Sequence, residues 1–404
     1  MPDILSQGRD HEPGPRRRRR LAVVAALVAA GAIVVGLRLP WSAHAHPHHG
    51  GHSGAAAAAS PSAGPRVIAE PNEPDGIAGP TRPWPPGLRL PVTGSQPAWY
   101  WPATGRRQPI GALPRDAVGY AFTRAAGGWA VQPGSASDPS CANCAGRPLP
   151  VYFLDDRAAS VSLVGVADAV APAIRPGRLW LTSFPAGASL DTAAGTAEEV
   201  SLSGARLGPQ FRLPPGYMVD RATSRGLLLE PAPIGRATTT DRLWDPAHPG
   251  AGRSFRDVIA TGPNEVAWAP PCVESCQARV LNLATGHTTV ITMPRGSTAA
   301  SGSFSPDGRL LALQVSYSTG SAGGSLAMQL EVASVASGRL TPVQGTWASS
   351  DALVGFGWPA ADDSLVAELG FTTKVQLTAW HHGQARLAVV ALSPREAATA
   401  LVTG

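Results

Sequence analysis

From about residue 97 onwards, short apolar runs alternate with turn signals along the chain. Six segments share one arrangement, in which a strand-like run, a tight turn and a more apolar run follow each other. Short runs rich in Val, Leu, Phe and Trp, bounded by Gly, Asn or Asp, are typical of β-strands. The residues at these turns are Gly128, Gly177, Gly226, Asn264, Gly308 and Asp363.

The turns recur at a period of roughly 47 residues, and a second pair of apolar runs follows each of them. Four short strands per repeat at this period predict a β-propeller blade, which cannot bury both of its faces alone. A partial unit at 98–113 precedes the six repeats, and the C-terminal residues 395–404 offer a further strand. We therefore expect an all-β chain whose residues 97–404 form a propeller of seven blades, with six or eight as alternatives.

One repeat carries a recognisable motif. The stretch "SFSPDGRLLAL" resembles the TolB-like, WD-type propeller repeat, with Pro306, Asp307 and Gly308 in the turn between the first two strands of a blade. "VLNLATGHTTVI" is similar to the third and fourth strands of the same repeats. The resemblance implies the fold and little about function, because such propellers serve as binding platforms, scaffolds and occasionally enzymes.

The N-terminus predicts export. Residues 1–20 form a short basic tail that ends in five arginines, and the apolar run "LAVVAALVAAGAIVVGL" follows directly. Its length is at the short end of a membrane span, and the arginines favour a cytoplasmic tail. We expect a transmembrane signal-anchor at 21–39 and an extracytoplasmic body, so that the protein is a single-pass membrane protein. A cleaved signal peptide that ends at "SAHA" is the alternative, and it also leads to export.

Residues 40–96 are rich in Pro, Gly, Ala and Ser, a composition that predicts a disordered linker. Five histidines gather in its first part: His44, His46, His48, His49 and His52. Dense imidazoles can bind zinc, copper or nickel, so this segment is a candidate metal site. The alternative is a solvated linker whose histidines bind nothing, because no acidic residue or cysteine among them completes a defined metal site.

The charge distribution argues against a nucleic-acid partner. The chain has a formal net charge of +5, but much of the excess lies in the N-terminal tail, and the body is nearly neutral. Nucleic-acid binding needs a basic patch on the folded part. Arginine replaces lysine almost throughout, with Lys374 as the exception, which is typical of a high-GC genome such as an actinobacterial one.

Four cysteines form two local pairs, Cys141 with Cys144 and Cys272 with Cys276. Both pairs lie between the second and third strands of their repeats, the first and the fourth, which are nearly opposite each other in a ring of seven. Cross-pairing and a shared zinc site are therefore excluded by distance. Outside the membrane we expect two local disulfides, each contributing about 2 kcal/mol because its loop is small. Redox catalysis is the weaker alternative, since no helix follows the first pair.

No contiguous catalytic motif is present in the chain: neither a nucleophile elbow nor a zinc-protease helix nor a phosphate-binding loop occurs. Asp155, Asp156, Asp362, Asp363 and the histidines of "WHHG" fit ordinary turns, and four tryptophans on predicted strands fit packing between blades: Trp129, Trp180, Trp268 and Trp358.

These observations predict a non-catalytic binding or scaffolding module for a cell-envelope protein or small ligand, without a cofactor. The alternatives are an extracytoplasmic propeller hydrolase or lyase with its site at the channel mouth, and an envelope protein that binds metal through the histidine-rich linker.

Overall fold

The structure is a computed structural model. It describes residues 84 to 392, with these exceptions: 85, 93–96, 112, 115–119, 135–146, 157–159, 233–239, 251, 271–275, 319–325, 344–345, 350–352, 360–363, 371–374 and 382–389.

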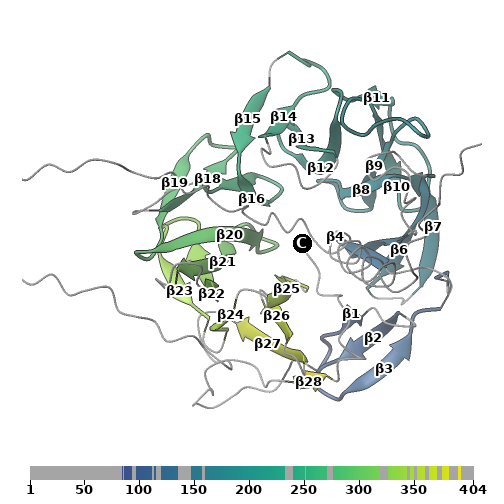
Figure 1. The fold of residues 1–404 in the computed structure, drawn as a ribbon. Coiled ribbons are helices and arrows are strands. Elements are labelled where there is room, and N and C mark those ends of the chain that lie inside the picture. The colour runs from purple at the N-terminus through teal and green to yellow at the C-terminus, as the bar shows by residue number, and fades with distance from the viewer. Residues whose placement is uncertain are drawn as a thin grey trace, which may run out of the picture.

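Seven antiparallel sheets stand around a central axis (Figure 1). The prediction of an all-β, seven-blade propeller is confirmed. Each sheet is a meander in which strands adjacent in sequence are hydrogen-bonded neighbours, and the first strand of each blade is the innermost. We number the blades 1 to 7 in chain order.

The strands of each blade have the following bounds. Blade 1 contains β1 Leu90–Val92, β2 Ala98–Trp101 and β3 Arg106–Pro109. Blade 2 contains β4 Tyr120–Ala125, β5 Gly128–Pro133, β6 Leu149–Asp155 and β7 Val161–Ala167. Blade 3 contains β8 Ala169–Pro172, β9 Arg178–Ser183, β10 Thr196–Ser201 and β11 Phe211–Arg212. Blade 4 contains β12 Tyr217–Thr223, β13 Gly226–Pro231, β14 Thr240–Trp244 and β15 Arg253–Arg256.

Blade 5 contains β16 Val258–Thr261, β17 Glu265–Trp268, β18 Gln277–Asn282 and β19 Thr288–Thr292. Blade 6 contains β20 Ser297–Phe304, β21 Leu310–Ser318, β22 Leu326–Ser334 and β23 Leu340–Pro342, with β24 Ala348–Ser349 paired to β22. Blade 7 contains β25 Leu353–Gly357, β26 Ser364–Gly370, β27 Val375–His381 and β28 Val390–Leu392.

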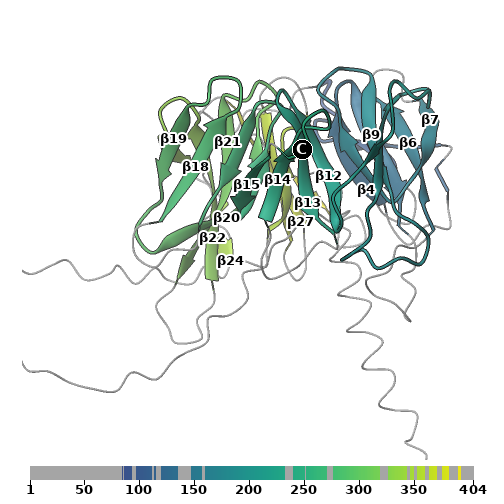
Figure 2. The same ribbon diagram turned by 90° about the horizontal axis from the view of Figure 1, so that it is seen from above.

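The meander gives the ring two unlike faces (Figure 2). Turns between first and second strands and between third and fourth strands lie on one face, which we call face 1. Connections between second and third strands, and from one blade to the next, lie on the opposite face, face 2. The glycine turns found in the sequence therefore all lie on face 1.

The first strands of blades 4 to 7 share a bulge, where the register to the second strand shifts by one residue. The shifts occur between Val219 and Arg221, between Val258 and Ala260, between Ala299 and Ser301, and between Leu353 and Gly355. A bulge bends its strand and increases the local twist. Its recurrence on successive blades gives their inner edges a common shape around the axis.

The core lies between blades rather than within one sheet. Each apolar cluster joins neighbouring blades. Blades 7, 1 and 2 share one, blades 3 and 4 share two, and the pairs 2 with 3, 4 with 5, 5 with 6, and 6 with 7 share one each. Of the four tryptophans predicted to pack between blades, Trp129 and Trp358 are buried. Trp358 also donates a hydrogen bond from Nε1 to the Ser303 carbonyl of blade 6, at 3.0 Å.

The folded part begins earlier than the composition indicates. Trp84, Leu88, Leu90 and Val92 are buried in the first cluster, and β1 pairs with β2. The predicted linker boundary at residue 96 is therefore too late. The proline-rich composition of this segment favoured a disordered linker. A strand as short as β1 can nevertheless form there, because only three of its residues have to pair with β2.

The described residues contain no helix, and hence none of a length and hydropathy that would cross a membrane. The predicted basic tail, the anchor at 21–39 and all five linker histidines lie outside the described residues.

The Pro306–Asp307–Gly308 turn of blade 6 closes over a buried acid of the preceding blade, Glu265. Gly308 has φ +71°, and a Cβ on it would lie 2.9 Å from the carboxyl carbon of Glu265. Glu265 accepts hydrogen bonds from the Asn264 N–H at 3.2 Å and from Asn282 Nδ2 at 3.5 Å. Burial raises the pKa of Glu265, the Asn264 bond lowers it, and the negative charge of Asp307 raises it again.

We expect Gly308→Ala to destabilise the fold by about 2 to 3 kcal/mol, because it combines left-handed strain of about 1 kcal/mol with a clash against Glu265. Gly286→Ala is the matched control, since Gly286 has φ +76° and nothing within 4 Å of its Cβ position. Urea unfolding of both variants measures the difference. Equal losses would show that the contact with Glu265 contributes nothing.

The raised pKa of Glu265 also predicts a pH effect. The folded state holds this proton more tightly than the unfolded chain, so its contribution to stability is lost as pH rises from the ordinary value of 4.5 through the raised pKa. Glu265→Gln removes that loss. The free energy of unfolding of the parent, measured against the variant, should therefore fall as pH rises above 4.5. A difference that stays constant with pH contradicts the assignment.

A candidate site between blades 3 and 4

A pocket of about 620 Å³ opens on face 1 between blades 3 and 4. Four chain segments enclose it: the β8–β9 turn, the β10–β11 loop, the β12–β13 turn and the β14–β15 loop. Its lining residues come from both blades: Ile174, Arg175, Arg178, Trp180, Glu199, Leu207, Gly208, Pro209, Phe211, Ala222, Thr223, Gly226, Leu227, Asp245, Pro246 and Ala247.

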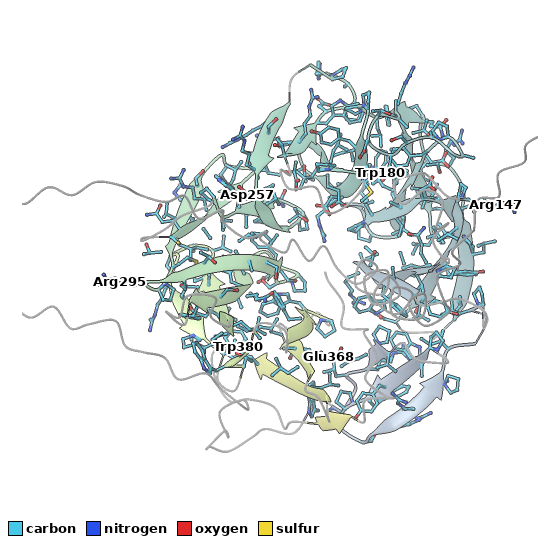
Figure 3. The ribbon with its side chains drawn as sticks, in the orientation of Figure 1. Arg147, Trp180, Asp257, Arg295, Glu368 and Trp380 are labelled. Atoms are coloured by element: carbon cyan, nitrogen blue, oxygen red, sulfur yellow. The ribbon has the colours of Figure 1, made fainter. Side chains whose placement is uncertain are left out.

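The wall of the pocket is largely apolar. Trp180 lies on β9 of blade 3 (Figure 3). Its ring centroid is 6.1 Å from that of Phe211 on β11, and both rings pack against the larger cluster shared by blades 3 and 4. Ile174 and Leu207 are 45% and 40% exposed, which is unusual for large aliphatic side chains on this protein. Apolar surface that stays open to water inside a concavity favours binding of an apolar group.

Glycine shapes the blade 4 side. Gly226 has φ +126°, and a Cβ on it would lie 2.4 Å from the carbonyl oxygen of Trp244. Only glycine therefore lets β13 begin this close to the end of β14. Thr223 fixes the turn before it, because its hydroxyl donates to the Gly226 carbonyl at 2.9 Å and accepts from the Arg225 N–H at 3.3 Å.

An ion pair and an aspartate–histidine pair include residues of the pocket lining. Arg178 Nη1 donates to Glu199 Oε2 at 3.3 Å, across the β9–β10 pair. Asp245 Oδ2 lies 2.9 Å from His248 Nδ1, and Oδ1 accepts from the Ala247 N–H at 2.9 Å. The bond with His248 is the main cause that lowers the pKa of Asp245, and the Ala247 bond adds to it. Asp245 thus remains a carboxylate and orients the imidazole.

The Asp245–His248 pair can perform acid–base chemistry. A carboxylate that bonds one ring nitrogen of histidine leaves the other nitrogen available to exchange a proton. His248 is 74% exposed at its side chain, so water reaches it freely. The pair lies on the β14–β15 loop, and Asp245 is itself part of the pocket lining.

Among the residues that the structure describes, no group of three or more His, Cys, Asp or Glu side chains is placed to hold a metal ion. Near face 1, Arg221 of β12 donates from Nε to Thr261 Oγ1 of β16 at 3.2 Å. Burial lowers the pKa of Arg221, and the charge of Asp220 raises it. This contact joins two inner strands.

Of the four cysteines, the structure describes Cys276. Cys276 directly precedes β18, is buried and packs in the cluster of blades 5 and 6. Cys141, Cys144 and Cys272 lie outside the described residues, and no described cysteine is free. The two local disulfides remain a prediction.

Asp156 lies in the third turn of blade 2, where it forms an ion pair with Arg124 at 2.6 Å. Its N–H donates to the Gly127 carbonyl at 3.0 Å. Asp362 and Asp363 lie outside the described residues. In "WHHG", Trp380 and His381 end β27, and Trp380 packs edge-on against Trp358 with centroids 6.2 Å apart.

The pocket residues were missed by sequence reasoning. Trp180 was expected only to pack between blades, yet it also lines the pocket. The stretch "DPAHP" at 245–249 carried the available signal, an Asp three residues before a His in a turn. Arg178 and Glu199 gave none, because the register of β9 with β10 brings them together.

Comparison with known proteins supports the fold. No protein-family model and no curated protein sequence matches the chain. A structure from a study of two prolyl endopeptidases aligns with a TM-score of 0.50 at 14% identity, over 78% of this chain and 50% of that one. This chain therefore spans about half the length of that peptidase.

Two archaeal proteins align less closely. The β-propeller domain of the trilobed protease from Pyrococcus furiosus aligns with a TM-score of 0.42 at 8% identity, over 68% of this chain and 83% of that one. Pyrococcus horikoshii acylaminoacyl peptidase aligns with a TM-score of 0.44 at 11% identity, over 72% and 47%. These structural neighbours are propeller-containing peptidases.

The prediction of a non-catalytic binding and scaffolding module is contradicted by the match to the prolyl endopeptidase structure, which agrees better with the alternative of a hydrolase-type propeller. At 14% identity this match shows only the shared fold. The catalytic motifs that are absent from this chain are each confined to one contiguous stretch of sequence. In a propeller, a site is assembled from turns of neighbouring blades, so a missing motif in the sequence does not exclude a site.

Proposed function

We propose that this protein is a hydrolase-type propeller that cleaves an ester or amide bond in the pocket between blades 3 and 4. The observation that carries the proposal is the Asp245–His248 pair beside a partly apolar pocket. The likeness to propeller peptidases agrees with this reading at the level of the fold.

The pair would act on water. Asp245 holds His248 through Nδ1, so that Nε2 accepts a proton from a water molecule while the water oxygen attacks the carbonyl carbon. The bond from the carbonyl carbon to its oxygen or nitrogen leaving group then breaks, and His248 returns the proton to that group. Water is consumed, and no oxidant or cofactor is needed.

Arg178 would assist by stabilising the oxygen on which negative charge develops. Its ion pair with Glu199 uses one donor at 3.3 Å, and a guanidinium has five. Preorganised donors of this kind are a large contribution to acyl-transfer catalysis. The apolar wall formed by Trp180 and Phe211 would hold the substrate.

Localisation and source are part of the proposal. We propose that the hydrolase faces the outside of the cell, tethered by the arginine-flanked apolar segment, and that its repeats are of the TolB-like type from a high-GC bacterium. An exported hydrolase requires a substrate that is available at the cell envelope. A partner protein at the envelope would bind a different surface of the propeller.

Substitution of the pair tests the chemistry. His248→Gln and Asp245→Asn should each lower kcat/KM on chromogenic esters and peptide anilides by about 10²-fold or more, because general base catalysis contributes that much. His287→Gln is the matched control. His287 lies exposed in the third turn of blade 5, the position that corresponds to His248 in blade 4.

The activities are compared only for variants that remain folded, as shown by near-ultraviolet circular dichroism and an unchanged Tm. Equal activity in parent, H248Q and D245N contradicts the proposed base, and so does the absence of turnover on every substrate.

A further inference from the structure

Some charged side chains of the pocket have a partner within the protein, and one cation does not form an ion pair among the described residues. Arg178 is paired with Glu199, and Asp245 with His248. Arg175 lies on the β8–β9 turn, lines the same pocket and is exposed. Within the described part of the chain, no acidic side chain forms an ion pair with it. The pocket therefore contains one positive charge that a ligand can match.

The apolar surface adjoins that charge. Ile174 precedes Arg175 on the same turn, and Leu207 of the β10–β11 loop lines the pocket with it. Both side chains are substantially exposed. Covering them removes apolar surface from water, which is favourable at roughly 25 cal/mol per Å². A matching ligand therefore has an apolar group next to an anionic one.

We propose that the pocket binds the free carboxyl end of a peptide whose terminal side chain is apolar. Arg175 would bind the terminal carboxylate in bidentate fashion, a geometry that its planar fork favours. The terminal side chain would contact Ile174, Leu207 and the Trp180–Phe211 wall. This inference rests on the proposed function and makes the protein a hydrolase that removes carboxy-terminal residues.

The proposed reaction is the hydrolysis of the last peptide bond of the substrate. Water adds its hydroxyl to the carbonyl carbon of the last peptide bond, the C–N bond breaks, and the departing nitrogen takes the proton held by His248. The products are a peptide shortened by one residue and a free amino acid with an apolar side chain. A peptide amide lacks the charge that Arg175 binds, so it is the discriminating probe.

Binding of a fluorescein-labelled Ala-Ala-Ala-Phe peptide, measured by fluorescence anisotropy with the full chain, tests the inference. The free acid should bind about tenfold more tightly than its carboxy-terminal amide. Arg175→Gln should weaken binding of the acid by about tenfold and leave binding of the amide unchanged. Arg339→Gln is the matched control, because Arg339 is an exposed cation just before β23 on face 1 and does not line the pocket. Equal affinity for acid and amide, or equal losses in R175Q, overturns the proposal.

Two further measurements separate this proposal from the catalytic one. Leu207→Ser should weaken binding of acid and amide alike, as a contact with the side chain requires; unchanged affinity contradicts the apolar part. Release of phenylalanine is then followed with parent and H248Q. If the acid binds selectively and no phenylalanine is released, the proposed hydrolysis fails while the carboxylate site stands. If esters are cleaved without selectivity for the acid, the carboxylate site alone fails.

Discussion

Packing between neighbouring blades is the constraint on which the rest of the structure depends. A single four-stranded sheet of this chain has two apolar faces and cannot bury either one against itself. Each apolar cluster accordingly joins residues from adjacent blades, and one of them joins the first blades of the chain to the last. Closing the ring is thus what buries the core.

The same constraint explains where chemistry is possible. Side chains between blades are used for packing, so polar groups that act on a ligand come from the turns at the two faces and from the strands next to them, as Arg178 of β9 does. On face 1, turns of neighbouring blades bond to each other, as Arg225 of blade 4 does with the carbonyls of Leu283 and Ala284 of blade 5. Between blades 3 and 4, long β10–β11 and β14–β15 loops leave a pocket between the sheets instead.

Two glycines at turns on face 1 limit how closely neighbouring segments can pack, and one of them lies against a buried acid. Gly226 and Gly308 have positive φ and lie against atoms of another segment, Trp244 in one case and Glu265 in the other. Both positions are sites where a side chain would push neighbouring elements apart. Gly308 therefore sets how closely blades 5 and 6 approach at face 1, and Gly226 sets how closely β13 and β14 approach beside the pocket.

The sequence by itself determined the fold class and favoured seven blades, because the alternation of apolar runs and turn glycines follows the meander directly. The tertiary structure decided the blade count against six or eight. It also located the turns such as Pro306–Asp307–Gly308, which depend on local φ and hydrogen bonding. It did not locate β1, whose three residues are ordered by pairing with β2, or the bulges in β12 and β16, which depend on neighbouring strands.

The pocket was decided by the tertiary structure alone. Arg175, Glu199 and Asp245 are 70 residues apart at most in sequence, yet their joint position depends on strand register and on the packing of blade 3 against blade 4. Local sequence patterns carry information only about residues that are close together along the chain. A site made of four turns from two sheets exists only once the ring has placed those sheets side by side.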